Sequence, residues 1–193
     1  MTSALSVENL GLTIGGAKIL EGITLSVKQN ETLGIIGPNG AGKTSFFNLL
    51  SGLREATTGT IHLGDKEITN LKPHQRAQAG IARTFQTSSI FPFLSLLENV
   101  RIAAQVADGS SMNLTKSADK YKEVLYRASA CLEQVGLLSK GALFAGALSH
   151  GDKRRLEIAI VLASKSDVVL LDEPMAGMSV ENFPALVEII RSL

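Results

Sequence analysis

Residues 31–52, ETLGIIGPNGAGKTSFFNLLSG, contain the pattern from which the rest of the chain can be interpreted. The apolar run from Leu33 to Ile36 predicts a short buried strand. The segment GPNGAGKT (37–44) follows it and matches the phosphate-binding pattern G-x-x-x-x-G-K-[ST] at every fixed position. SFFNLLS then shows helical spacing, and Gly52 stands where a helix C-cap glycine belongs. A strand, a glycine-rich loop and a helix together are the context in which this pattern binds phosphate.

Each residue type in this loop has a chemical reason. Gly37, Gly40 and Gly42 lack a Cβ, so the backbone can take a positive φ and approach a phosphate closely. Successive N–H groups then point into one concavity, and the helix adds the positive end of its dipole. Lys43 offers a full charge to the β- and γ-phosphates, and Thr44 offers a hydroxyl to Mg²⁺. We predict a nucleoside triphosphate site that includes Gly37, Pro38, Asn39, Gly40, Ala41, Gly42, Lys43, Thr44 and Ser45.

Composition narrows the class of protein. A chain of 193 residues allows one α/β domain with a small inserted subdomain. The formal charge of +1 gives no basic field for nucleic acid. The N-terminus lacks the basic region and apolar core of a signal peptide, and no apolar run is long enough to cross a bilayer. We expect a cytoplasmic protein that reaches a membrane only through a partner. Cys131 is expected to be a small buried hydrophobe in a helix.

Hydrophobic spacing and turn residues predict the other elements. Gly15-Gly16 is a hairpin signal, and residues 108–117 are polar and expected to be a loop. A capping-box pattern at Ser95 opens a helix, and glycines at 80 and 136 end two others. The expected strands are residues 5–14, 23–27, 61–63, 81–85 and 168–171. The expected helices are residues 73–79, 95–107, 118–135 and 181–193, besides the two that follow the glycine-rich patterns.

Two further patterns indicate chemistry. Ser149 is expected to cap the next helix, with Asp152 three residues on, while Gly151 leaves the backbone N–H groups open. The result is a second anion site at a helix N-terminus, although a capped helix start is by itself usually structural. Asp172 and Glu173 end the apolar strand at 168–171, where α/β sheets place ligands.

Together these motifs resemble the ATP-binding subunits of ABC transporters, over nearly the whole chain and in the order of that family. GPNGAGKT looks like the Walker A motif, and RTFQ contains the Q-loop glutamine, Gln86. LSHGD looks like the signature, VVLLDEP like Walker B, and residues 175–179 occupy the D-loop position. RTFQ, RRLEIA and DEPMAGM look most like the branched-chain amino acid importer subfamily, to which the urea and amide importers are close.

The resemblance implies an α/β fold, a P-loop NTPase core of the ABC type with an N-terminal antiparallel β subdomain. Residues 1–193 would form a single ABC ATPase domain, with a nucleotide-binding core at 1–86 and 150–193 and a helical subdomain at 87–149. The family's switch histidine lies on a strand well beyond Walker B, whereas the histidines here are at positions 62, 74 and 150. The C-terminal part of the fold is therefore expected to be missing, and the chain alone is expected to bind Mg-ATP better than it hydrolyses it.

The resemblance also implies residue roles, with ATP and Mg²⁺ as the bound groups. Lys43 and the loop amides would hold the phosphates, and Thr44, Gln86 and Asp172 would hold the metal ion. The catalytic residues would be Glu173, which polarises the attacking water, and Gln86, which senses the metal and the γ-phosphate. Ser149 and Gly151 would contact the nucleotide of a sibling or identical ATPase subunit in a head-to-tail dimer.

The implied partners are membrane permease subunits and, indirectly, a periplasmic binding protein, with no nucleic acid. The helical subdomain would dock the permease, and Phe91, Phe93 and Leu94 are candidates for that contact. The subunit would be cytoplasmic and peripheral to the inner membrane through the permease.

Three positions depart from the family, and two alternatives stay open. His150 and Asp152 replace the glycine and glutamine of the commonest signature, and Ile14 stands where an aromatic residue usually stacks on adenine. One alternative is a soluble ABC-type ATPase that acts on nucleic acid or ribosomes, although such proteins generally carry two cassettes or long basic or coiled-coil insertions. The other is a truncated ATP-binding module with little hydrolysis, because the switch histidine is missing.

Overall fold

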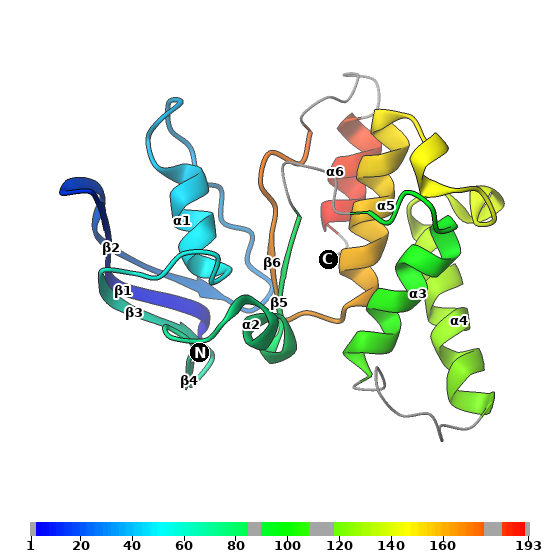
Figure 1. The fold of residues 1–193 in the computed structure, drawn as a ribbon, viewed down its shortest axis with the longest axis horizontal. Coiled ribbons are helices and arrows are strands. Elements are labelled where there is room, and N and C mark those ends of the chain that lie inside the picture. The colour runs from blue at the N-terminus through cyan, green and yellow to red at the C-terminus, as the bar shows by residue number, and fades with distance from the viewer. Residues whose placement is uncertain (1–2, 85–89, 109–117, 176–182, 192–193) are drawn as a thin grey trace. The chain divides into compact units, whose positions relative to one another are not determined.

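The computed structural model describes residues 3–84, 90–108, 118–175 and 183–191 (Figure 1). The chain divides into two compact units. The first is formed by Met1–Ala82 and Asp167–Leu170, and the second by Arg83–Ser166 and Leu171–Leu193. Each unit has its own hydrophobic core.

The first unit contains a four-stranded antiparallel sheet with the strand order β2-β1-β3-β4. Its strands are β1 (Ser3–Ile14), β2 (Ala17–Lys28), β3 (Thr58–Leu63) and β4 (Lys66–Glu67). Gly15 and Gly16 join β1 to β2 with φ angles of 56° and 84°, the conformation that a tight hairpin turn requires. The predicted strands at 5–14, 23–27 and 61–63 are confirmed, and each is longer than the sequence pattern indicated.

Helix α1 (Lys43–Leu50) covers one face of this sheet (Figure 1). Its buried residues share a hydrophobic core with the sheet, and this core includes Phe46, Leu49, Leu50, Val7, Leu10 and Ile61. Beyond β4 the chain forms α2 (Pro73–Ala79), which ends at Gly80 with a φ of 113°. A separate two-stranded sheet pairs β5 (Ile81–Arg83) with β6 (Val168–Leu170). The predicted helix at 73–79 is confirmed, and β5 and β6 fall within the predicted strands.

The predicted strand at residues 33–36 is wrong. Residues 31–38 form no strand, and Ile36 is 97% exposed. A strand is stabilised by hydrogen bonds to a neighbouring strand, and no strand in the described part of the chain pairs with this segment. The spacing of the apolar residues is typical of an inner strand of a sheet. A strand forms only where a neighbouring strand pairs with it, and the spacing does not show whether one does.

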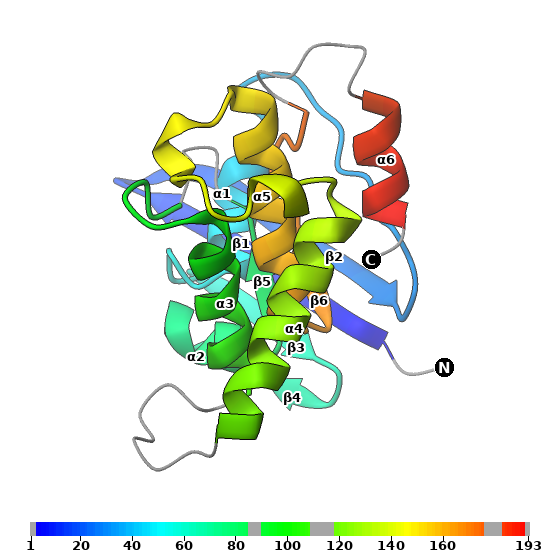
Figure 2. The same cartoon turned by 90° about the vertical axis from the view of Figure 1, so that its right-hand side faces the viewer.

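The second unit is helical. Its helices are α3 (Leu96–Ala107), α4 (Ala118–Gln134), α5 (His150–Ala163) and α6 (Phe183–Arg191), with short 3₁₀ helices at Leu138–Lys140 and Ala145–Ala147. Helices α3, α4 and α5 pack against one another (Figure 2), around a core that includes Leu96, Val100, Leu132 and Leu156. Among the described residues, no helix combines the length and the apolar character needed to cross a membrane.

Local sequence sets the start of α3 and the end of α4, as predicted. The Ser95 hydroxyl accepts a hydrogen bond from the backbone N–H of Glu98 at 3.1 Å, which caps α3. Gly136 follows α4 with a φ of 70°, which suits the end of a helix. Cys131 on α4 is buried, and desolvation raises the pKa of its thiol. Its predicted role as a buried hydrophobe is confirmed.

Candidate active site

The glycine-rich loop and the start of α1 lie in the first unit, with Lys43 folded back over the loop. Lys43 Nζ donates hydrogen bonds to the carbonyl oxygens of Gly37, at 2.5 Å, and Pro38, at 2.8 Å. Residues 37–41 and Thr44 are exposed. The loop therefore combines an ammonium held by two of its own carbonyl groups with exposed residues.

Two glycines in the loop need the conformational freedom that the sequence suggested. Gly40 and Gly42 have φ angles of 83° and 88°. Gly42 precedes α1 directly, and a Cβ at this position would come within 2.7 Å of Leu20 Cδ2. Gly37 is not among the glycines with a positive φ. The tight turn of the loop depends on Gly40 and Gly42.

The N-terminus of α1 suits an anion. Its N-cap residue, Gly42, makes no side-chain hydrogen bond to the helix, and its first turn contains no acidic residue. The first N–H groups of a helix lack intrahelical acceptors and carry the positive end of the helix dipole. With the ammonium of Lys43 beside them, these groups fit the phosphates of a nucleotide.

The acidic pair lies in the second unit, and Asp172 is part of a buried ion pair. Arg83 Nη2 contacts Asp172 Oδ2 at 3.0 Å, and the two side chains are 6% and 9% exposed. The backbone N–H of Asp172 donates to Thr84 Oγ1 at 3.4 Å. A carboxylate has two oxygens, so Asp172 can keep Arg83 on Oδ2 and bind a cation through Oδ1.

Glu173 differs from its neighbour because it is exposed and has a φ of 47°. This left-handed conformation costs a non-glycine residue about 1–2 kcal/mol. Residues kept in such conformations are held by their surroundings, and they occur often at functional sites. Arg154 of α5 donates a hydrogen bond to the Glu173 carbonyl oxygen at 2.8 Å. Glu173 is therefore exposed on a turn whose backbone is held by a hydrogen bond from Arg154.

The start of α5 has the predicted cap. The Ser149 hydroxyl accepts a hydrogen bond from the backbone N–H of Asp152 at 3.2 Å. Lys140 Nζ lies 2.6 Å from Asp152 Oδ2, so a cation stands beside this helix terminus. Beyond its chain neighbours and the backbone of its own helix, a Cβ built on Gly151 would have no atom within 4 Å. The cap is confirmed, and the binding of an anion by Ser149 and Gly151 stays a prediction.

Other predicted residues are placed less completely. Gln86 and the D-loop positions 176–179 lie outside the described residues. Phe91 and Phe93 are 54% and 88% exposed, as a docking contact requires, and Leu94 is half-buried. Ile14, at the expected adenine position, is 41% exposed. The roles of these residues stay predictions.

Two arginines beside the acidic pair were missed by sequence reasoning. Arg83 begins RTFQ and Arg154 belongs to RRLEIA, so both were inside motifs that the sequence had already indicated. Nothing in the spacing of either motif shows that its arginine would reach residues 172–174. The contacts depend on tertiary structure within the second unit.

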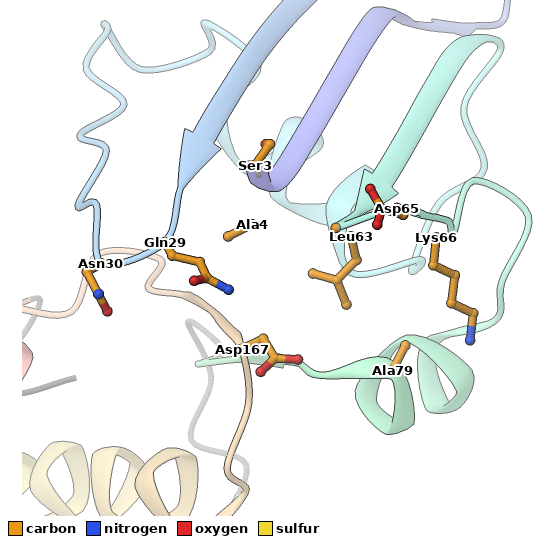
Figure 3. Close-up of a pocket in the computed structure, with 10 residues that line it drawn as sticks. Ser3, Ala4, Gln29, Asn30, Leu63, Asp65, Lys66, Ala79 and Asp167 are labelled. Atoms are coloured by element: carbon orange, nitrogen blue, oxygen red, sulfur yellow. The ribbon is translucent and has the colours of Figure 1, made fainter. Parts of the chain in front are cut away.

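The first unit also contains a cavity of about 470 Å³ that no sequence pattern predicted (Figure 3). Its lining includes Gln29, Asn30, Asp65, Lys66 and Asp167. None of the predicted nucleotide contacts lines it. The cavity is therefore distinct from the loop at 37–45.

A glycine-rich loop closed by a lysine at the start of a helix defines a P-loop nucleotide-binding protein. Residues 20–176 match the family described as ABC transporter. The chain belongs to this family, as a nucleotide-binding ATPase subunit. The predicted fold class, an ABC-type P-loop NTPase with an antiparallel β subdomain, is confirmed by this match and by the similar solved structures.

Three similar proteins illustrate the relationship. The high-affinity branched-chain amino acid transport ATP-binding protein LivG of Escherichia coli K12 is 37% identical, over 98% of this chain and 76% of that protein. BraF of Pseudomonas aeruginosa, which has the same description, is 34% identical, over 97% of this chain and 77% of that protein. A crystal structure of the ADP conformation of an ATP-binding cassette from an ABC transporter has a TM-score of 0.83 and 28% identity. The match between the two structures covers all of this chain and 76% of the cassette.

Proposed function

We propose that this ATPase subunit powers an importer of branched-chain amino acids. The observation that carries the proposal is the similarity to LivG and BraF, two branched-chain amino acid transport proteins, over 98% and 97% of the chain. The geometry of the Lys43 loop supports the binding step, because a cation and an uncapped helix N-terminus stand together.

In the proposed reaction the loop at 37–45 holds the phosphates of ATP. Lys43 offsets their charge, and the N-terminal N–H groups of α1 donate hydrogen bonds to them. Glu173 accepts a proton from the attacking water as the water oxygen bonds to the γ-phosphorus and the bond to the bridging oxygen breaks. Gln86 senses the γ-phosphate. The products are ADP and phosphate.

Mg²⁺ fits the oxygen ligands that this chain offers. The proposed ligands are the hydroxyl of Thr44, the carboxylate of Asp172 and the side chain of Gln86. Mg²⁺ in nucleotide sites is commonly held by one or two protein groups together with substrate phosphates and water. Such a site needs no acidic cluster, and among the described residues no group of three or more His, Cys, Asp or Glu could hold a metal ion. Bound Mg²⁺ would neutralise phosphate charge during the reaction.

The proposed assembly contains two ATPase subunits, sibling or identical, arranged head to tail. Ser149 and Gly151 of one subunit would then contact the nucleotide bound by the other. The helical subdomain at 87–149 would dock a membrane permease, with Phe91 and Phe93 as exposed apolar contacts. A periplasmic binding protein would deliver the substrate, and no nucleic acid would take part. In this proposal the subunit is cytoplasmic and peripheral to the inner membrane through the permease.

The Lys43→Ala variant should bind Mg-ATP at least about tenfold more weakly than the wild type. The variant loses a charge-assisted contact to phosphate, which contributes about 1.5–3 kcal/mol. Calorimetric titration of both proteins measures the change. Equal affinities would contradict the assignment of the phosphate-binding loop.

The matched control is Lys66→Ala. Lys66 is an exposed lysine of the same unit and lines the other cavity. Removal of the Lys66 side chain should leave the affinity for Mg-ATP unchanged. Weaker binding in Lys66→Ala than in Lys43→Ala would place the nucleotide in that cavity.

Reconstitution with membrane permease subunits of an importer tests the transported substrate. ATP-dependent uptake should be seen with leucine, isoleucine or valine and a matching binding protein. Uptake of urea or a short amide in place of these amino acids would assign the subunit to the neighbouring importer class.

A further inference from the structure

Arg154 forms several hydrogen bonds with the backbone of residues 172–174. Its Nη2 donates to the carbonyl oxygens of Asp172, at 3.3 Å, and Glu173, at 2.8 Å. Its Nε donates to the carbonyl oxygen of Pro174 at 3.2 Å. The residue is 7% exposed. One guanidinium thus binds three consecutive carbonyl groups at the point where the chain leaves the Walker B strand.

Glu157 completes the arrangement on the same helix. Arg154 Nη1 lies 2.6 Å from Glu157 Oε2, and both side chains are less than 10% exposed. The carboxylate balances the buried charge and fixes the plane of the guanidinium, because Arg–carboxylate contacts are directional. A lysine could replace the charge, but its single ammonium could not reach the same set of acceptors in the same geometry.

The turn that Arg154 contacts contains a residue in an unfavourable backbone conformation. Glu173 has a φ of 47°, which a glutamate seldom adopts without support. Its carbonyl oxygen receives the shortest of the three backbone hydrogen bonds from Arg154. If the backbone at Glu173 relaxed to a negative φ, the direction of its side chain would change with it.

We propose that Arg154 is a positioning residue for ATP hydrolysis, which fixes the turn at residues 172–174 and so aims the Glu173 carboxylate. This inference rests on the proposed role of Glu173 as the group that polarises water. Arg154 itself does not touch the substrate. Its effect is therefore on kcat, and nucleotide affinity depends on the loop at 37–45.

The first test is Arg154→Lys, which keeps a positive charge beside Glu157 and gives up the three-carbonyl contact. The second is the double variant Arg154→Met with Glu157→Met, which removes both buried charges together. This variant avoids leaving Glu157 as an unpaired buried charge. The carbonyl groups of residues 172–174 lose their donor, so urea denaturation must show that the variant is folded under the assay conditions. Both variants should hydrolyse ATP about tenfold to a hundredfold more slowly, because small misplacements of a catalytic group have effects of this size.

Helix α3 provides the matched control. Arg101 forms an ion pair with Glu98, three residues before it, and this pair also lies in the second unit. The variants Arg101→Lys and Arg101→Met with Glu98→Met change an ion pair of the same residue types, although a more exposed one, without a hydrogen bond or ion pair to residues 172–174 in the described part of the chain. They should retain wild-type kcat.

Three measurements decide the proposal: kcat, the dissociation constant for Mg-ATP, and amide hydrogen exchange of the peptide at 168–175. We expect a lower kcat, a dissociation constant within about threefold of wild type, and faster exchange in that peptide alone. A kcat within twofold of wild type in the double variant, or a loss of affinity that matches the loss of rate, would overturn the inference. If the wild type itself did not hydrolyse ATP, the proposed function would fail, and unchanged exchange in the double variant would separately overturn the role of Arg154.

Discussion

Glu173→Gln should lower the rate of ATP hydrolysis by about 10²–10⁴-fold, the range that positioned acid–base groups contribute. Glutamine keeps the shape of the side chain but cannot accept the proton of the attacking water. The hydrogen bond from Arg154 to the backbone of residue 173 should persist in the variant, because it uses the carbonyl oxygen of Glu173 and not its side chain. Nucleotide affinity should change little. ATP should therefore persist in the paired state, and light scattering should show more ATP-dependent dimer in the variant than in the wild type.

A control variant sharpens this experiment. Glu133→Gln changes an exposed carboxylate of α4 in the same unit, and it should leave turnover unchanged. Wild-type turnover in Glu173→Gln would move the catalytic role elsewhere. Asp172 would then be the next residue to test, although its ion pair with Arg83 would make Asp172→Asn a structural change as well.

Arg76→Met should have the largest effect on stability, with a loss of about 3–5 kcal/mol in the free energy of unfolding. Arg76 is 2% exposed, and its guanidinium donates to the carbonyl oxygens of Leu49, Leu50, Thr69 and Leu71. Desolvation lowers the pKa of Arg76, and these four acceptors offset the cost of burying its charge. Methionine fills the space but leaves buried carbonyl groups without their donor.

Two of these acceptors are at the C-terminal end of α1, so the variant should loosen the helix that begins at Lys43. Urea denaturation measures the loss, and Arg54→Met, which changes an exposed arginine nearby, is the control. Similar denaturation midpoints for Arg76→Met and Arg54→Met would show that these carbonyl contacts contribute little. Nucleotide binding by Arg76→Met should weaken in proportion to the unfolded fraction.

Features that depend on neighbouring residues were predictable from the sequence. Ser95 and Ser149 cap the helices that follow them because a hydroxyl and the N–H three residues on are brought together by the helix itself. The hairpin at Gly15-Gly16 and the turn at Gly42 follow from the conformations open to glycine. The local sequence pattern likewise predicted the P-loop at the start of the helix that is now α1.

Features that depend on distant residues were not predictable. The segment at 33–36 has the composition of an inner strand, yet its state is decided by whether another strand pairs with it. Arg83 and Asp172 lie 89 residues apart in the chain, and no periodicity relates them. Arg154 reaches Glu173 across 19 residues, through packing that a motif does not encode.

The exposed segment at residues 31–38 has a practical consequence for work with this protein. Leu33 and Ile35 are 46% and 38% exposed, and Ile36 is almost entirely exposed. An exposed apolar stretch that pairs with no strand of the described residues favours association with other copies of the chain, through backbone pairing and apolar contact. Cooling weakens apolar association, and dilution disfavours it by mass action. Purified samples should therefore stay monodisperse longest when they are kept cold and dilute.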